Sequence, residues 1–310
     1  MGNKLLLHAE KIDKRFGPTH AVKEVSLDFY EGEIHALIGE NGSGKSTFTN
    51  MLTGILPIGS GTFTLSGEQV APKNQVDANH HGIAIVVQET GTLSGLTVAE
   101  NMFLGDEDQF IKNGLKDTRA MNKKAQELLD AYGLSYIKAT SAVDMYNFED
   151  RKLVEIVRST YFDPKILVVD ETTTALSQSG RDKLFEVMRD VRAKGHCVIF
   201  ISHDMAEVMD MSDRISILRD GDFITTVDVS EVDEARWAIT TTAPTTPTTP
   251  ASPRATSPCA WRRSPSPASS TRSPSRCAMV RSWVSAACPS AACTRSARRS
   301  SARPTTAPAR

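Results

Sequence analysis

The sequence predicts an α/β fold in which a mostly parallel sheet is covered by helices on both faces. Short, continuous apolar runs recur along the first 238 residues and alternate with segments of helical periodicity. Such runs are typical of strands that are buried on both faces of a sheet. A glycine-rich run also stands between a predicted strand and a predicted helix, at 39–44.

The elements before this glycine-rich run are predicted to be strands. Leu5–Ile12 alternates loosely and favours a strand, and residues 14–18 favour a turn. Val25–Phe29 and Ile34–Ile38 lie on either side of a Glu-Gly dipeptide and are interpreted as a strand pair. This pair leads directly into the glycine-rich run.

A helix is expected to follow the glycine-rich run, and helical periodicity dominates the next long segment. Residues 45–53 favour a helix, which ends at a glycine and a nearby proline, and Ile83–Gln88 favours a short strand. From about residue 90 to 162 the periodicity is helical, most clearly in Asn122–Ala131 and Arg151–Thr160. We therefore expect an inserted helical lobe over residues 90–162.

Apolar runs return after the lobe and complete the sheet. Ile166–Val169, Cys197–Ser202 and Ile215–Leu218 are predicted strands, and Gly180–Ala193 is a predicted helix. Cys197 is the one cysteine of the first 239 residues and lies within an apolar run. We interpret it as a small buried hydrophobic residue, which excludes a disulfide framework or a cysteine zinc site for this part of the chain.

The glycine-rich run matches the phosphate-binding pattern G-x-x-x-x-G-K-[ST] in the strand–loop–helix context that the pattern requires. Its glycines let successive backbone N–H groups face a phosphate, and the helix N-terminus adds to that field. Lys45 is expected to reach the β- and γ-phosphates, and the Ser46 hydroxyl to ligate Mg²⁺. The predicted nucleotide-binding residues of the loop are Gly39, Glu40, Asn41, Gly42, Ser43, Gly44, Lys45, Ser46 and Thr47.

Polar side chains follow three of the predicted strands. Asp170 and Glu171 end one strand, His203 follows another, and Gln88 ends a third. Parallel strands place their carboxyl ends along one crevice, so these groups should meet the phosphates. We expect Asp170 to hold Mg²⁺, Gln88 to contact Mg²⁺ or the attacking water, and Glu171 to polarise that water. The remaining histidines, at positions 8, 20, 35, 80, 81 and 196, are interpreted as surface or packing residues.

These motifs, in this order, resemble the nucleotide-binding domain of an ABC transporter over roughly residues 5–235. The resemblance implies that Phe16 stacks on adenine, Gln88 is the Q-loop residue, Asp170-Glu171 is Walker B and His203 is the switch histidine. The phrases GENGSGKST, DETTTAL, ISHD and RDG are similar to those of duplicated ATP-binding proteins from bacterial uptake systems for ribose, galactose or xylose. The resemblance to that subfamily implies that the protein is an ATPase with ATP and Mg²⁺ as cofactors. Members of the subfamily normally carry a second, similar half.

One departure from the family matters. The family's signature, usually close to LSGGQ, should precede Arg151–Thr160, but the residues there are Tyr-Asn-Phe-Glu-Asp, at 146–150. Phe148 and Glu149 replace the two glycines, so we expect a carboxylate to approach a γ-phosphate there. Thr172 replaces a proline after Glu171, a milder change. Sequences of this kind resemble the weak half of an asymmetric pair, which predicts slow hydrolysis by this chain alone.

The last 71 residues, 240–310, have a different composition. Among them 62 are Thr, Ala, Pro, Ser or Arg, and they carry +11, which leaves −12 for residues 1–239. All but three of the 71 belong to types whose codons have C or G at the middle base. We interpret 239–310 as a disordered, low-complexity tail read out of frame from a GC-rich gene. In a shifted frame, Met279–Arg299 can spell GEVLGLGGLSECGMHEVGKA, which resembles the glycine-rich loop that opens a second half.

The expected partners follow from the resemblance. They are the permease subunits of a sugar importer, an extracellular or periplasmic sugar-binding protein acting indirectly, and either a second ABC half or another copy of this chain. No apolar run long enough to span a membrane and no signal peptide is present, so we expect a cytoplasmic protein held at the inner face of the membrane.

Two alternatives remain open: a soluble ABC ATPase that acts on ribosomes or DNA, and a tail that is a true nucleic-acid-binding arm. A GTPase is disfavoured because no NKxD motif follows the loop. The main interpretation has no nucleic-acid partner.

Overall fold

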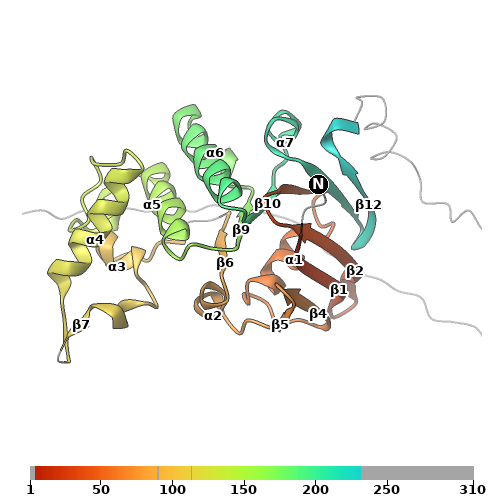
Figure 1. The fold of residues 1–310 in the computed structure, drawn as a ribbon, viewed down its shortest axis with the longest axis horizontal. Coiled ribbons are helices and arrows are strands. Elements are labelled where there is room, and N and C mark those ends of the chain that lie inside the picture. Colours follow the sequence, from red (N-terminus) through yellow and green to blue (C-terminus); the bar gives the residue numbers. More distant parts are fainter. Residues whose placement is uncertain (1–3, 89–90, 113, 232–310) are drawn as a thin grey trace, which may run out of the picture. The chain divides into compact units, whose positions relative to one another are not determined.

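The computed structural model describes residues 4–88, 91–112 and 114–231. Within them, a six-stranded and a four-stranded sheet, together with a short two-stranded hairpin, combine with seven α-helices (Figure 1). The segment 239–310, interpreted above as a disordered tail read out of frame, lies outside the described residues. The α/β class expected from the sequence is confirmed.

The six-stranded sheet positions the phosphate-binding loop, and its order is β12-β11-β3-β10-β9-β6. All neighbouring strands run parallel except β12, which is antiparallel to β11. The mostly parallel sheet predicted from the apolar runs is therefore present. Its strands are β3 (Ile34–Ile38), β6 (Ile83–Val86), β9 (Ile166–Asp170), β10 (Cys197–Ile201), β11 (Arg214–Arg219) and β12 (Asp222–Asp228).

The four-stranded sheet is antiparallel, with the order β2-β1-β4-β5, and sequence reasoning missed it as a separate layer. Its strands are β1 (Leu5–Phe16), β2 (Thr19–Tyr30), β4 (Ser60–Leu65) and β5 (Glu68–Val70). β2 and β3 were expected to pair with each other, and that prediction was wrong. The backbone N–H of Gly32 instead lies 3.1 Å from the Gly195 carbonyl oxygen. All five residues of β3 are buried, so it needs β10 and β11 on its two sides.

The helices cover both faces of the six-stranded sheet. They are α1 (Lys45–Leu52), α2 (Gln75–His80), α3 (Val98–Met102), α4 (Thr118–Ala131), α5 (Phe148–Tyr161), α6 (Gln178–Ala193) and α7 (Met205–Met211). Buried residues of α3 to α7 share one hydrophobic core with one face of the sheet. Those of α1 and α2, together with the antiparallel sheet, share a second core with the other face.

Alternation along a single strand explains the two cores. In β9, Ile166 and Val168 belong to the core with the antiparallel sheet, whereas Leu167 and Val169 belong to the core with the helices. Successive side chains of a strand point to opposite faces, so a fully apolar strand feeds both cores. The apolar runs read from the sequence therefore reflect burial on two sides.

The segment from 90 to 162 contributes α3, α4 and α5, which pack against one another (Figure 1). It is not wholly helical, because β7 (Ile111–Lys112) and β8 (Leu115–Lys116) form a short hairpin within it. Its buried side chains belong to the same core as one face of the six-stranded sheet. Helix α5 also contacts β6 directly, and β6 ends at Val86, two residues before Gln88 and earlier than the predicted strand end.

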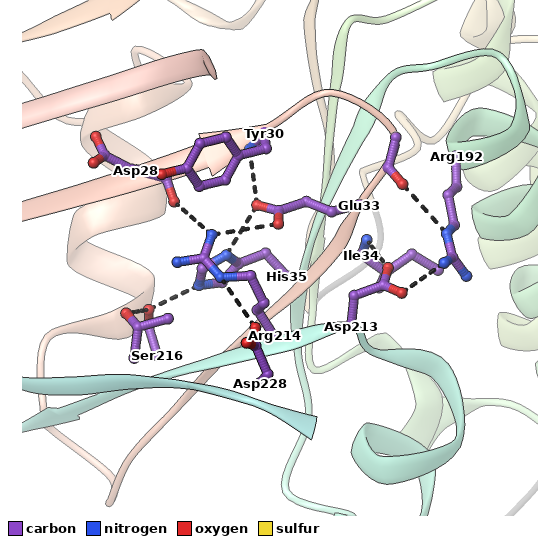
Figure 2. Close-up of polar contacts among 12 residues, drawn as sticks. Asp28, Tyr30, Glu33, Ile34, His35, Arg192, Asp213, Arg214, Ser216 and Asp228 are labelled. Atoms are coloured by element: carbon purple, nitrogen blue, oxygen red, sulfur yellow. Dashed lines mark hydrogen bonds and ion pairs between the residues drawn. The ribbon is translucent and has the colours of Figure 1, made fainter. Parts of the chain in front are cut away.

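A buried polar cluster joins the two sheets away from the phosphate-binding loop (Figure 2). His35 is fully buried on β3, with its Nε2 2.7 Å from the Ser216 hydroxyl and its Nδ1 3.1 Å from Glu33. Arg214 lies 3.4 Å from the same Glu33 carboxylate, and its guanidinium stacks over Tyr30 at 4.9 Å from the ring centroid. The packing role expected for His35 is consistent with this position.

Candidate functional site

The phosphate-binding loop runs from the end of β3 to the start of α1, and two neighbouring hairpins set its path. A Cβ on Gly39 would lie 2.1 Å from the Leu218 carbonyl oxygen, at the end of β11. A Cβ on Gly44 would lie 2.4 Å from the Ala21 carbonyl oxygen of β2, and Gly44 has a φ of +99°. Only glycine fits at these positions, so the motif is required by the packing of the loop as well as by any ligand.

Lys45 is the first residue of α1 and is almost fully buried at the base of the loop. Its Nζ donates to the carbonyl oxygens of Gly39 at 2.9 Å and Glu40 at 3.1 Å. Burial lowers the pKa of the ammonium, and the carboxylates of Glu171 and Asp170 act in the opposite direction. The charge is thus held against the loop, within the field of two carboxylates.

A cleft of about 330 Å³ opens over this loop. Gln88 from beyond β6 and Glu171 from beyond β9 face the loop across it, as expected from the parallel strand ends. The residues that line the cleft are Asn41, Gly42, Ser43, Gly44, Lys45, Ser46, Thr47, Gln88 and Glu171. Most of the residues predicted from three separate motifs therefore meet in one cavity.

Asp170 ends β9 and is buried with an incomplete set of partners. Its Oδ1 has no hydrogen-bond partner within the described part of the chain. Burial raises the pKa of this carboxyl, while a hydrogen bond with the Ser46 side chain lowers it. A buried, unpaired carboxylate oxygen beside a hydroxyl is a costly arrangement unless a cation completes it. The donor set of Asp170, Ser46 and Gln88 oxygens suits a hard cation such as Mg²⁺.

Glu171 connects Gln88 and His203. Its Oε2 accepts a hydrogen bond from the Gln88 amide at 2.9 Å, and its Oε1 lies 2.7 Å from His203 Nε2. Glu171 has a left-handed backbone with a φ of +44°, and its N–H donates to the Ile201 carbonyl oxygen at 2.9 Å. This bond to the neighbouring strand holds the unusual backbone, which turns the side chain toward the cleft.

Phe16 and Glu40 lie apart from the residues that line the cleft. Phe16 ends β1, its side chain is half exposed, and Lys14 Nζ lies 5.5 Å from its ring centroid. It pairs with Thr19 at the start of β2, the strand that also carries Ala21 against Gly44. Glu40 contributes its backbone carbonyl to Lys45.

The segment 146–150 forms the start of α5, and its two carboxylates have partners in the same chain. Asn147 caps the helix by accepting from the Asp150 N–H at 2.8 Å. The Glu149 carboxylate accepts from the Ser177 hydroxyl at 2.5 Å and from its N–H at 3.2 Å. Asp150 accepts from the Tyr136 hydroxyl at 2.7 Å. The Glu149 carboxylate, which we expect to approach a γ-phosphate, is therefore also bound within this chain to Ser177, the N-cap of α6.

Sequence reasoning missed two charged residues that contact the Gln88 segment. Lys152 and Glu155 lie one helical turn apart on α5, are both buried, and face Val87 and Gly91. The only signal in the sequence is an oppositely charged pair at i,i+3 within the helical pattern. Such pairs usually stabilise exposed helix surfaces, so the pattern alone does not indicate burial.

Two of the other histidines have carboxylate partners in the antiparallel sheet. His8 pairs with Asp28 at 2.6 Å, and His20 pairs with Asp13, both in the antiparallel sheet. Cys197 is buried, as expected, and burial raises the pKa of its thiol. Among the described residues, no helix has the length and apolar character needed to cross a membrane.

Comparison with known proteins adds three kinds of finding. Residues 22–174 match the family model described as ABC transporter. The ribose import ATP-binding protein RbsA of Shouchella clausii is 38% identical over 227 residues, which is 73% of this chain and 45% of that protein. RbsA of Yersinia pestis bv. Antiqua is 41% identical over 219 residues, which is 71% of this chain and 43% of that protein. The chain thus spans less than half the length of the curated relatives it matches.

Solved structures show the same fold. A nucleotide-free ATP-binding cassette from an ABC transporter aligns with a TM-score of 0.63 and 27% identity, covering 72% of this chain and 91% of that one. The ADP conformation of MJ1267, another such cassette, aligns with a TM-score of 0.61, 27% identity and the same coverage. The dimeric cassette MJ0796 with ADP and Pi has a TM-score of 0.62 at 23% identity, covers 72% of this chain and 99% of that one, and supports the fold alone.

Proposed function

Because the chain belongs to the ABC transporter family as an ATP-binding protein, we propose that it binds Mg²⁺ and ATP in the loop cleft and hydrolyses ATP to drive a bacterial monosaccharide importer. The observation that carries the proposal is the single cleft that gathers the phosphate-binding loop, Gln88 and Glu171, with His203 in contact with Glu171. The similarity to ribose import proteins supports a sugar of that class.

The loop is proposed to bind the phosphates. Its backbone N–H groups and the start of α1 supply a field that favours anions. Lys45 exchanges its bonds with the loop carbonyls for bonds to the β- and γ-phosphates. Phe16, at the exposed tip of the β1–β2 hairpin, stacks on the base. Stacking accepts any purine, so ATP is preferred over GTP only weakly.

A metal ion is proposed to complete the buried oxygen set. Asp170, Ser46 and the amide oxygen of Gln88 are the residues that would hold Mg²⁺, and the unpaired Oδ1 of Asp170 is the observation that supports this fit. When bound, Mg²⁺ neutralises charge that develops between the β- and γ-phosphates. The chain's own residues orient the nucleotide around it.

Glu171 is proposed to act on the attacking water. Its carboxylate already lies between the Gln88 amide and the His203 imidazole, so it can accept a hydrogen bond from a water that enters the cleft. His203 is then placed to contact the γ-phosphate. General-base and positioning effects of this kind contribute rate factors of about 10²–10⁴.

The proposed partners follow from what the relatives are named for. We propose that the 90–162 segment contacts membrane permease subunits, that a periplasmic or extracellular sugar-binding protein acts indirectly, and that nucleic acid is no partner. The protein then works at the cytoplasmic face of the membrane. A second ABC half, or another copy of this chain, supplies the opposite wall of the ATP site.

We propose that the chain hydrolyses ATP slowly by itself. In this family a site is enclosed between the loop of one half and the signature of the other, and the described part of this chain offers residues 146–150 for that purpose. Glu149 and Asp150 already occupy the first turn of α5 and use its favourable field for negative charge. A γ-phosphate arriving there meets two carboxylates, so a pair of these chains lacks good donors.

The assignment of the nucleotide site is tested with Lys45→Ala in the full chain. We expect ATP affinity to fall by about a hundredfold or more, because at least two charge-assisted hydrogen bonds are lost. Lys123→Ala on the exposed face of α4 is the matched control and should bind ATP normally. Undiminished ATP affinity in Lys45→Ala would contradict the site, and capture of ribosomal proteins in place of a permease would contradict the transport assignment.

A further inference from the structure

One carboxylate binds the backbone N–H groups of Val87 and Gly91, which lie on either side of Gln88 in the sequence. Glu155 Oε1 accepts the N–H of Val87 at 2.9 Å, and Oε2 accepts the N–H of Gly91 at 3.0 Å. These two residues flank Gln88, and Glu155 lies on α5, which is far away in the sequence. A single side chain of the helix therefore binds backbone N–H groups before and after Gln88.

Lys152 completes this arrangement. Its side chain is fully buried, and its Nζ donates to the Val87 carbonyl oxygen at 2.7 Å and to Glu155 Oε2 at 2.9 Å. Both polar groups of the Val87 backbone are thus bound by the pair, one by each member. Arg158 adds a second positive charge near Glu155 and is itself partly neutralised by it.

The space around the pair leaves little tolerance. A Cβ on Gly91 would lie 3.1 Å from Glu155 Oε1, which is closer than ordinary contact. Burying two charges is expensive, and a pair of this kind is often no more stable than apolar residues of the same size. We attribute the pair's role to geometry. Directed hydrogen-bond donors and acceptors orient particular backbone groups, which apolar side chains of the same size do not.

We propose that Lys152 and Glu155 are positioning residues that hold Gln88 at the nucleotide site and link it to the start of α5. Gln88 reaches Glu171 at 2.9 Å from the segment they hold, and Lys152 lies one turn after Phe148, the first residue of α5. A shift of α5 moves Val87 and Gly91 with it, and so moves the Gln88 amide relative to Glu171. This inference rests on the proposed role of Gln88 as a ligand of Mg²⁺.

The experiment compares Glu155→Gln, Gln88→Ala and the double variant in the full chain. Glu127→Gln is the control, because it removes a carboxylate from the exposed Lys123–Glu127 pair of α4. Lys152→Met/Glu155→Gln serves as a second variant that removes both charges of the pair together, in case Glu155→Gln does not fold. Two quantities are measured: amide exchange at residues 87 and 91, and the ratio of ATP affinity with Mg²⁺ to ATP affinity with EDTA.

Glu155→Gln should speed exchange at both amides by about tenfold or more, the effect expected when bonds to a charged acceptor are lost. The Mg²⁺-to-EDTA affinity ratio should fall to the level of Gln88→Ala, the double variant should fall no further, and affinity in EDTA should stay within about twofold. A purely structural pair would lower both affinities together and leave their ratio unchanged.

Unchanged exchange at residues 87 and 91 would overturn the inference, and so would effects of Glu155→Gln and Gln88→Ala that add in full. Should Gln88→Ala leave the affinity ratio unchanged, the proposed metal role of Gln88 fails. The link from the pair to the metal then fails with it, while the exchange rates still decide whether the pair holds the segment.

Discussion

Two acidic segments of this chain, the end of β9 and the start of α5, have opposite degrees of hydrogen-bond satisfaction. At the end of β9, Asp170 is buried with one oxygen unpaired, and burial raises the pKa of its carboxyl. At the start of α5, Glu149 and Asp150 are bound by Ser177 and Tyr136. The comparison teaches that a carboxylate's chemistry depends on which partners the fold has already given it. An unpaired carboxylate oxygen can bind a ligand, whereas a paired carboxylate stabilises the fold.

The largest expected effect comes from replacing residues 146–150, whose carboxylates already have partners, with a segment that can bind phosphate. Supplying an intact second half, with 239–310 read in the shifted frame, should raise ATP turnover by about 10²–10³, the contribution of a set of donors to a developing charge. In the present chain Glu171→Gln should change the slow residual rate by less than about threefold. Steady-state phosphate release measures both rates. Fast hydrolysis by the purified chain, lost in Glu171→Gln, would mean that the segment at 146–150 does not limit activity.

Asp170 and Glu149, one acid from each segment, can also be replaced by the corresponding amides one at a time. Asp170→Asn should weaken Mg²⁺-dependent ATP binding by at least about tenfold, because the unpaired oxygen loses its charge. Glu149→Gln should leave ATP binding unchanged and lower the free energy of unfolding by about 0.5–1.5 kcal/mol through its weakened bonds to Ser177. Nucleotide titration and urea unfolding separate the two outcomes. Equal losses of ATP affinity in both variants would erase the distinction between the segments.

The smallest effect concerns His35, a buried titratable group in the fully bonded cluster of Figure 2. Burial lowers the pKa of this imidazole, against the opposing effect of Glu33 and with the support of Arg214. The unfolded chain then binds the proton more readily, so stability is full above the unfolded pKa of about 6.5 and falls as pH drops below it. Between pH 6.5 and 5.5 this loss is at most about 1.4 kcal/mol.

Urea unfolding of the wild type and of His35→Gln at pH 7.5, 6.5 and 5.5 isolates the contribution of this histidine. The wild type should lose more stability on acidification than the variant, since the glutamine does not titrate. Parallel losses in the two proteins would show that another group is responsible.

Strand positions and the loop could be predicted because their signals are local. The apolar run at Ile166–Val169 and the pattern at 39–47 each specify one element without information from elsewhere in the chain. The antiparallel sheet could not be predicted as a layer, because β1 and β4 are joined by contacts across about fifty residues. The predicted pairing of β2 with β3 was wrong for the same reason. Burial of β3 on both sides decides its pairing, and its neighbours are β10 and β11.

Some features of the candidate site could likewise be predicted from the sequence, and others could not. The sequence alone predicts that Gln88, Asp170 and Glu171 lie close together, because parallel strands end at a shared edge of the sheet. The bond between Glu149 and Ser177 could not, since it depends on the relative placement of two helix starts. The role of Lys152 was hidden because nothing in an i,i+3 charge pair distinguishes a buried helix face from an exposed one.

The close packing around the phosphate-binding loop has a thermodynamic consequence. Gly39 and Gly44 lie against backbone carbonyls of β11 and β2, and the Gly221 N–H donates to the Ser43 carbonyl oxygen at 3.2 Å. The loop is therefore ordered before any ligand arrives, and association does not require the conformational entropy of a free loop to be lost. Affinity for phosphate is then sensitive to the two hairpins that brace the loop. Substitutions near Ala21 or Leu218, which line no part of the cleft, should loosen binding by restoring that freedom.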